Sequence, residues 1–150
     1  MKNDKTDNHE QIFWEEIDRL FPDMIKAIAS LSKKSYLSIT NLRTGITWWS
    51  ERAMDYFGMK ENYTIRGMEK ANRKIHPDDV ATFKRGFKER VDGKNLDTAW
   101  EYRIQDGDSY NRFNAMARVL YDEQEQPFII IIRYDNYGIS DEVDSVTGLY

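Results

Sequence analysis

The stretch WEYRIQDGDSYNRFNAMARVLYDEQEQPFIIIIRY, residues 100–134, decides the fold. Apolar and polar residues alternate from Ala99 to Gln105, which predicts a strand with one buried face. The Asp106-Gly107 dipeptide is a strong hairpin signal and leads into a second predicted strand, Tyr110–Tyr121. After a polar turn, Pro127–Tyr134 holds the longest apolar run of the chain and predicts a third strand. Three strands joined by short turns predict an antiparallel meander.

Two further strands precede this meander. Tyr36–Leu42 and Ile46–Ser50 flank a short turn and predict a hairpin. Ser50 is a good N-cap for a short helix that ends at Gly58. Residues 59–75 have a mixed pattern, from which we expect one or two short helical turns.

A longer helix is expected before the meander begins. Pro77 suits the first turn of a helix, and the two acids after it complement the positive end of the helix dipole. The helix should continue to Val91. The predicted fold class is therefore α+β, with a five-stranded antiparallel sheet and helices inserted between the second and third strands.

The N-terminal part has a different pattern. Residues 1–8 are polar and predict a disordered lead, whereas residues 9–33 predict an amphipathic helix that Pro22 interrupts. Apolar residues recur at spacings of four and three along one seam: Phe13, Ile17, Leu20, Met24 and Leu31. This seam either packs on the sheet of its own domain or pairs with the same helix of a second subunit, and the sequence leaves both arrangements open.

The composition excludes several classes of protein. The 150 residues are 40% hydrophobic and carry a net charge of -4 with both signs interspersed, which argues against a nucleic-acid or membrane surface. Without cysteine, the chain cannot form disulfides, thiolate nucleophiles or cysteine-based metal sites. No stretch has the length and apolarity of a membrane span or signal peptide, so we expect a cytoplasmic location.

Several motifs, taken in order, resemble those of PAS domains over residues 36–137. They are Trp48-Trp49-Ser50 followed by Phe57-Gly58, then Ile75-His76-Pro77-Asp78-Asp79, then Glu101-Tyr102-Arg103-Ile104 with Asp106-Gly107, and finally Ala117 to Pro127. Asp135 corresponds to an Asp that often ends the last PAS strand and leads into the output segment, although the residues after it depart from the family pattern. The resemblance implies a PAS domain over residues 34–137 and a signal-transfer role for Asp135.

The last seven residues, Asp144-Ser145-Val146-Thr147-Gly148-Leu149-Tyr150, resemble the opening of GGDEF domains, with Val146 in place of the usual Leu. This second resemblance implies that residues 138–150 are a linker and the start of a diguanylate cyclase domain, with Asp144 at the point of signal transfer. The chain would then be a non-catalytic sensory domain that controls the attached cyclase in cyclic di-GMP signalling, and it would act as a homodimer. The alternatives are a ligand-free dimerisation module that positions two cyclase domains and, third, a small α+β enzyme.

The PAS resemblance also indicates where a small ligand would bind. The candidate pocket lining is Trp48, Phe57, Trp100, Tyr102, Phe113, Ala117 and Ile130. Large aromatic rings occupy the volume that a ligand would need, so a filled core is the favoured interpretation. Flavin attached through cysteine is excluded, while a noncovalent flavin or a small metabolite stays open. His76 lies just before the long helix, which argues against haem, and its neighbouring acids are better explained by helix initiation than by a metal site.

Overall fold

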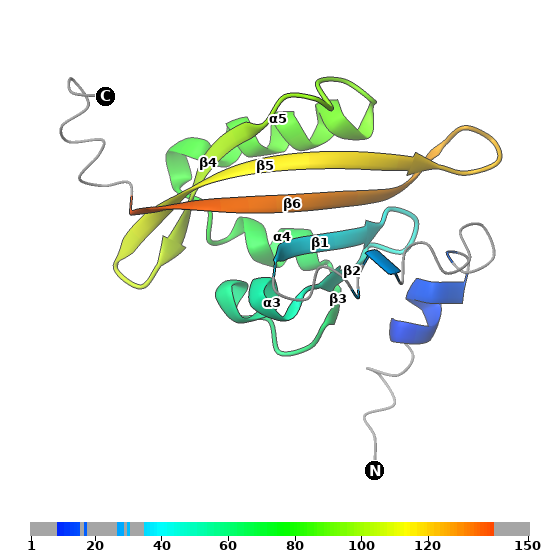
Figure 1. The fold of residues 1–150 in the computed structure, drawn as a ribbon, viewed down its shortest axis with the longest axis horizontal. Helices are drawn as coiled ribbons and strands as arrows, with labels where there is room; N and C mark the ends of the chain where they lie inside the picture. Colours follow the sequence, from blue (N-terminus) through cyan, green and yellow to red (C-terminus); the bar gives the residue numbers. More distant parts are fainter. Residues whose placement is uncertain (1–8, 16, 18–26, 29, 31–34, 140–150) are drawn as a thin grey trace, which may run out of the picture.

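The computed structural model describes residues 9–15, 17, 27–28, 30 and 35–139. Its centre is one antiparallel sheet with the strand order β3-β2-β1-β6-β5-β4 (Figure 1). The strands are β1 (Tyr36–Asn41), β2 (Ile46–Trp49), β3 (Tyr63–Ile65), β4 (Trp100–Asp106), β5 (Ser109–Tyr121) and β6 (Pro127–Ile139). The helices are α3 (Glu51–Phe57), α4 (Gly67–Asn72), the 3-10 turn η1 (Pro77–Asp79) and α5 (Val80–Val91).

The sheet has six strands, so the prediction of five was wrong by one. The additional strand is β3, which pairs with β2 through Thr47 and Thr64. Its Tyr-Thr-Ile sequence has high strand propensity, but three residues are too few for an alternating pattern to stand out. Of the helical turns expected in residues 59–75, α4 is the α-helix that forms.

The last strand is longer than the sequence predicted. β6 continues to Ile139, five residues beyond Tyr134, because β5 offers a partner as far as the pair Asn111 and Ile139. Asn136 and Gly138 are residue types that are common in turns. They are accommodated by a register shift in the β5–β6 ladder, close to Gly138 with its positive φ of 90°.

The local helix signals were correct. The Ser50 side chain accepts a hydrogen bond from the Ala53 backbone N–H and caps α3, and Gly58 ends that helix in the left-handed conformation with a φ of 70°. Pro77 begins η1, which leads directly into α5. The Nδ1 atom of His76 accepts the Asp78 backbone N–H at 3.1 Å, so the side chain of His76 caps this turn.

Apolar side chains pack on both faces of the sheet. On the inner face, β4, β5 and β6 contribute residues that pack with α3, α4 and α5. On the outer face, the buried residues are Leu37, Ile39, Ile46, Trp48, Phe128 and Ile129, together with Phe13 and Ile17 from the N-terminal helical segment. Two apolar layers explain why the apolar run in β6 is continuous rather than alternating.

Phe13 and Ile17 are both 0% exposed and pack against the sheet of their own chain. The Nε1 atom of Trp14 also donates a hydrogen bond to the Tyr63 hydroxyl at 2.6 Å, which joins the helical segment to β3. This part of the predicted seam is therefore used within the chain. Leu20, Met24 and Leu31 lie outside the described residues.

The two edges of the sheet differ. The edge at β4 is covered by the segment before η1: the backbone N–H of His76 donates to the Arg103 carbonyl at 2.9 Å, and the Gln105 N–H donates to the Lys74 carbonyl at 2.7 Å. At the opposite edge, no described strand lies beyond β3. Among the residues described, no helix has the length and apolar character needed to cross a bilayer.

Candidate functional site

The inner face of the sheet brings together six of the seven predicted lining residues. Phe57 comes from α3, and the other five come from the three strands of the meander. All six are buried in the inner layer: Phe57, Trp100, Tyr102, Phe113, Ala117 and Ile130. Alternation along each strand accounts for this placement, because every second side chain faces the helices.

Trp48 is the exception, and the prediction that it lines the interior was wrong. Successive strand residues point to opposite faces, so Trp48 and Trp49 cannot share one. Trp49 lies in the inner layer, whereas Trp48 packs with Phe13 in the outer layer. Two adjacent tryptophans in a strand must face opposite sides of the sheet, but the sequence does not show which of them faces inward.

Aromatic rings fill most of the interior. The ring centroids of Phe83 and Tyr102 are 4.8 Å apart in an edge-to-face arrangement, and those of Trp49 and Phe57 are 5.2 Å apart. Tyr134 joins them, 5.6 Å from Phe57. These contacts are in the range at which aromatic pairs are favourable, so the rings form a packed core.

The cavity between α4, the start of α5 and the inner face of the sheet has a volume of about 10 Å³. Its lining is Phe57, Met68, Ala71, Asn72, Ile75, Phe83, Tyr102, Ile104 and Tyr134. Ligand pockets usually measure about 300–1,000 Å³, and about 10–15 Å³ holds a single water molecule. This cavity does not fit a flavin ring, and in this conformation it corresponds to a filled core.

Four polar atoms in this core have no hydrogen-bond partner among the described residues: the hydroxyl of Tyr102, Oδ1 of Asn72 and the Nε1 atoms of Trp49 and Trp100. Burial raises the pKa of Tyr102 well above its usual value, so its phenol is neutral. An unmade buried hydrogen bond costs about 1–3 kcal/mol. These atoms are the polar groups that a rearranged interior would offer to a ligand.

Tyr134 was missed in the lining prediction, although it alternates in phase with Ile130 and Ile132. Its hydroxyl lies 3.1 Å from the Ser38 hydroxyl, which joins β6 to β1. Burial also raises the pKa of Tyr134 above its usual range. Extending the alternating pattern one step beyond the apolar run would have placed Tyr134 among the predicted lining residues.

Asp79 of the His76-Pro77-Asp78-Asp79 motif has a structural role, whereas the Asp78 side chain is exposed. Asp79 Oδ2 accepts hydrogen bonds from the backbone N and Nε of Arg103 at 2.8 and 2.9 Å, and Oδ1 accepts from Nη2 at 3.0 Å. These bonds from Arg103 are the main cause that lowers the pKa of Asp79. Within the part of the chain that the structure describes, no three His, Asp or Glu side chains are grouped closely enough to hold a metal ion.

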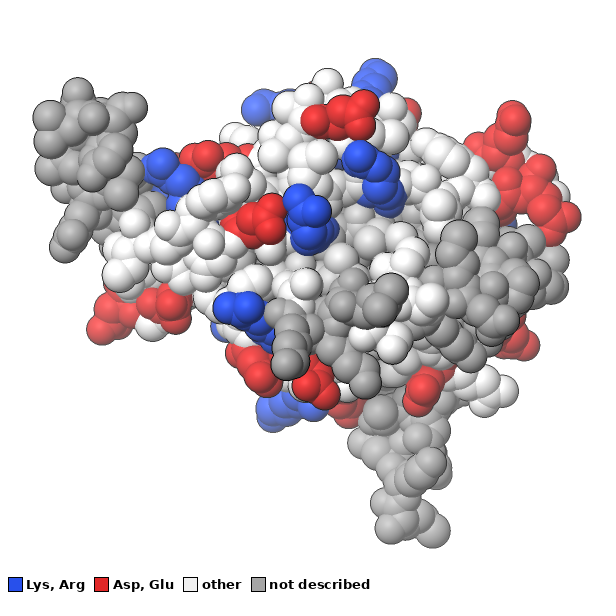
Figure 2. Space-filling view, viewed as in Figure 1, with Lys and Arg blue, Asp and Glu red and all other residues white. Residues whose placement is uncertain are grey.

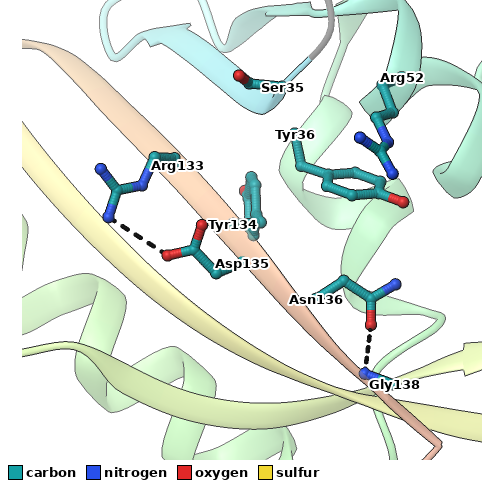
Figure 3. Close-up of a pocket in the computed structure, with 8 residues that line it drawn as sticks. All are labelled: Ser35, Tyr36, Arg52, Arg133, Tyr134, Asp135, Asn136 and Gly138. Carbon is teal, nitrogen blue, oxygen red and sulfur yellow. Dashed lines mark hydrogen bonds and ion pairs between the residues drawn. The ribbon is translucent and has the colours of Figure 1, made fainter.

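A second hollow, of about 490 Å³, opens on the surface where β6 leaves the core (Figure 3). Arg133 and Asp135 form an ion pair of 3.3 Å on one side, and the Arg52 guanidinium lies 4.6 Å from the centre of the Tyr36 ring on the other. Exposed pairs such as Arg133–Asp135 contribute little stability. Asp135 therefore lies where β6 passes from the core to the surface. Its role in signal transfer stays a prediction, and Asp144 lies outside the described residues.

Residues 46–132 match a protein family described as "PAS fold". No curated protein matches the sequence.

Several solved structures have a similar fold. A sensory box histidine kinase/response regulator from Burkholderia thailandensis E264 superposes with a TM-score of 0.60 at 16% identity, over 82% of this chain and 90% of that one. The N-terminal domain of a diguanylate cyclase with PAS/PAC sensor from Marinobacter aquaeolei gives 0.55 at 14% identity, over 69% and 95%. A light-oxygen-voltage domain studied with a flavin analogue gives 0.51 at 11% identity, over 84% and 93%. At these identities the likeness shows the fold alone.

Proposed function

The chain belongs to the PAS-fold family, and from this premise we propose that it is the sensory input domain of a diguanylate cyclase. Support for the cyclase comes from the last seven residues, which resemble the opening of a GGDEF domain, and from the similar fold of the Marinobacter aquaeolei cyclase domain. The Burkholderia thailandensis neighbour belongs to a histidine kinase, so the type of output rests mainly on the terminal motif. The limits 34–137 and 138–150 and the cytoplasmic location stay predictions.

The continuity of β6 carries the proposal. Tyr134 is 3% exposed in the inner layer, Asp135 faces the surface hollow, and the same strand continues to Ile139. Asp144 follows Ile139 by five positions. A change in core packing that shifts β6 would therefore reach the start of the cyclase domain through a short connection. The two packing states of the sensory domain would then favour different arrangements of the cyclase.

A ligand-free dimerisation module is the second candidate, and the filled interior favours it. With a cavity of about 10 Å³, a small metabolite could bind only if α4 or α5 moved away from the sheet. A homodimer would use surfaces other than Phe13 and Ile17, which are buried in their own chain. Leu20, Met24 and Leu31 remain the predicted seam. Light scattering over a range of concentrations tests this, and a strict monomer would exclude it.

Nucleic acid and membrane surfaces are not proposed as partners. Acidic and basic side chains are interspersed on the face drawn in Figure 2 and do not gather into one basic patch. The small-enzyme alternative would need a buried, unpaired carboxylate in an open pocket. Among the described residues, the Asp122 side chain is only 4% exposed, but it pairs with Arg43 and accepts hydrogen bonds from the backbone N–H groups of Gln124 and Gln126. We therefore keep the non-catalytic sensory role as the proposal.

The test uses the complete parent protein and measures cyclic di-GMP formed from GTP. Inserting Gly-Ser directly after Ile139 should change the rate several-fold, because it separates the end of β6 from the cyclase. The control is the same insertion after Gln124, in the exposed β5–β6 turn. If no cyclic di-GMP forms, or if both insertions leave the rate as it was, the proposal is wrong.

A further inference from the structure

Among the described residues, no strand pairs with the outer side of β3. In the β2–β3 pair, the Trp49 N–H donates to the Asn62 carbonyl at 2.8 Å and the Arg66 N–H donates to the Gly45 carbonyl at 3.1 Å. Residues in an antiparallel strand direct their N–H and C=O groups alternately to either side. The N–H and C=O of Ile65, which lies between these bonded positions, therefore point away from β2, and its side chain is 38% exposed.

A groove of about 780 Å³ runs along this edge. Tyr63, Thr64 and Ile65 line it from β3, while Lys70 and Arg73 line it from α4. His9 closes it from the N-terminal helical segment. The groove therefore lies beside the sheet edge rather than inside the core, and it is separate from the hollow at Asp135. In Figure 1, β3 lies at the lower end of the sheet, near α3.

The charge of the groove is opposite to that of the whole chain. Four cations line it, Lys60, Arg66, Lys70 and Arg73, against the two acids Glu61 and Glu69, whereas the chain carries a net charge of -4. Arg66 and the first turn of α4 follow β3 directly, so the cations cluster around the exposed edge. A local excess of positive charge on an acidic protein favours a negatively charged partner.

We propose that this groove binds an extended acidic peptide segment of a partner protein, which adds to β3 as a further antiparallel or parallel strand. The edge presents a carbonyl as well as an N–H, and a peptide backbone pairs with both, whereas a phosphate group would accept from the donor but be repelled by the carbonyl. Alternate side chains of such a strand face opposite sides. The peptide side chains on the face toward Lys70 and Arg73 should be acidic. Those on the face toward Tyr63 and Ile65 should be apolar.

The test measures fluorescence anisotropy of a labelled peptide of about eight alternating Glu and Val residues, long enough to span β3 and its flanks. We expect saturable binding at low ionic strength. The Lys70→Glu/Arg73→Glu double variant should weaken it by about tenfold, since each exposed charge pair contributes modestly. The matched control is Lys84→Glu/Arg85→Glu, the same charge change on the exposed side of α5, which should leave binding unchanged.

Two further probes separate strand addition from simple charge attraction. A peptide of the same sequence with alternate backbone nitrogens methylated should lose binding, and so should one with Lys in place of Glu. Equal binding of the methylated peptide, equal binding to the Lys70→Glu/Arg73→Glu variant, or displacement by inorganic phosphate at similar concentrations would overturn the proposal. Binding that appears only after residues 1–8 are removed would overturn it too, because the occupant would then be the chain itself.

Discussion

The Asp79–Arg103 pair is the contact whose loss should be easiest to measure. Asp79 ties the start of α5 to β4 with three charge-assisted hydrogen bonds, and both side chains are mostly buried, at 19% and 23% exposed. A hydrogen bond to a charged group contributes about 1.5–3 kcal/mol, and three bonds to one carboxylate are not additive. Asp79→Ala should therefore cost about 2–3 kcal/mol, which corresponds to roughly 4–10 °C in Tm for a domain of this size.

The assay is urea unfolding followed by fluorescence of the buried tryptophans, at neutral and acidic pH. The pKa of Asp79 is lowered in the folded state, chiefly by the hydrogen bonds from Arg103. Its stabilisation is therefore complete above the unfolded pKa of about 3.9 and is lost as the pH falls toward the lower folded value. The difference in the free energy of unfolding between the wild type and Asp79→Ala should become smaller below about pH 4.

Asp78→Ala is the matched control, because the neighbouring carboxylate is 81% exposed and should change the free energy of unfolding by less than about 0.5 kcal/mol. The reasoning would be refuted if both variants lost the same free energy of unfolding, or if the difference between the wild type and Asp79→Ala stayed constant in acid.

Three other substitutions follow from the packing. Phe13→Ala should cost about 3–5 kcal/mol in urea unfolding, because the ring is fully buried on the outer face, and a loss below about 1 kcal/mol would mean that the helical segment is not docked there. Gly86→Ala should cost about 1–3 kcal/mol, since its Cβ would lie 2.8 Å from Trp100; an unchanged Tm would contradict this contact. Tyr102→Phe should be neutral or stabilising by up to about 1 kcal/mol, because the hydroxyl has no hydrogen-bond partner among the described residues, and a clear loss would show that it has one.

Local chemistry accounts for the parts of the fold that were predicted correctly. The cap at Ser50, the left-handed residue at Gly58 and the proline that opens η1 each act within a few residues. The alternation in β4 places Trp100, Tyr102 and Ile104 on one buried face in the same way. Such signals need no knowledge of distant contacts.

Two of the errors concern pairing between distant segments. β3 exists because β2 lies beside it, and β6 extends to Ile139 because β5 is long enough to pair with it. For these two strands, the competing term was a tertiary contact that overrides weak local propensity. The Trp48 error has another cause: the pleat puts Trp48 and Trp49 on opposite faces, and packing decides that Trp49 is the one that faces inward.

For the candidate site, the sequence alone determined which residue types would meet, namely an aromatic set on one face of a meander, without cysteine. It also supplied a terminal motif that resembles the opening of a GGDEF domain. The tertiary structure decided that these rings fill the interior to a cavity of about 10 Å³, that Asp79 is held by Arg103, and that cations from two elements collect beside β3. The reason is physical: periodicity and capping are local, whereas free volume, partner choice and surface charge depend on segments that only folding brings together.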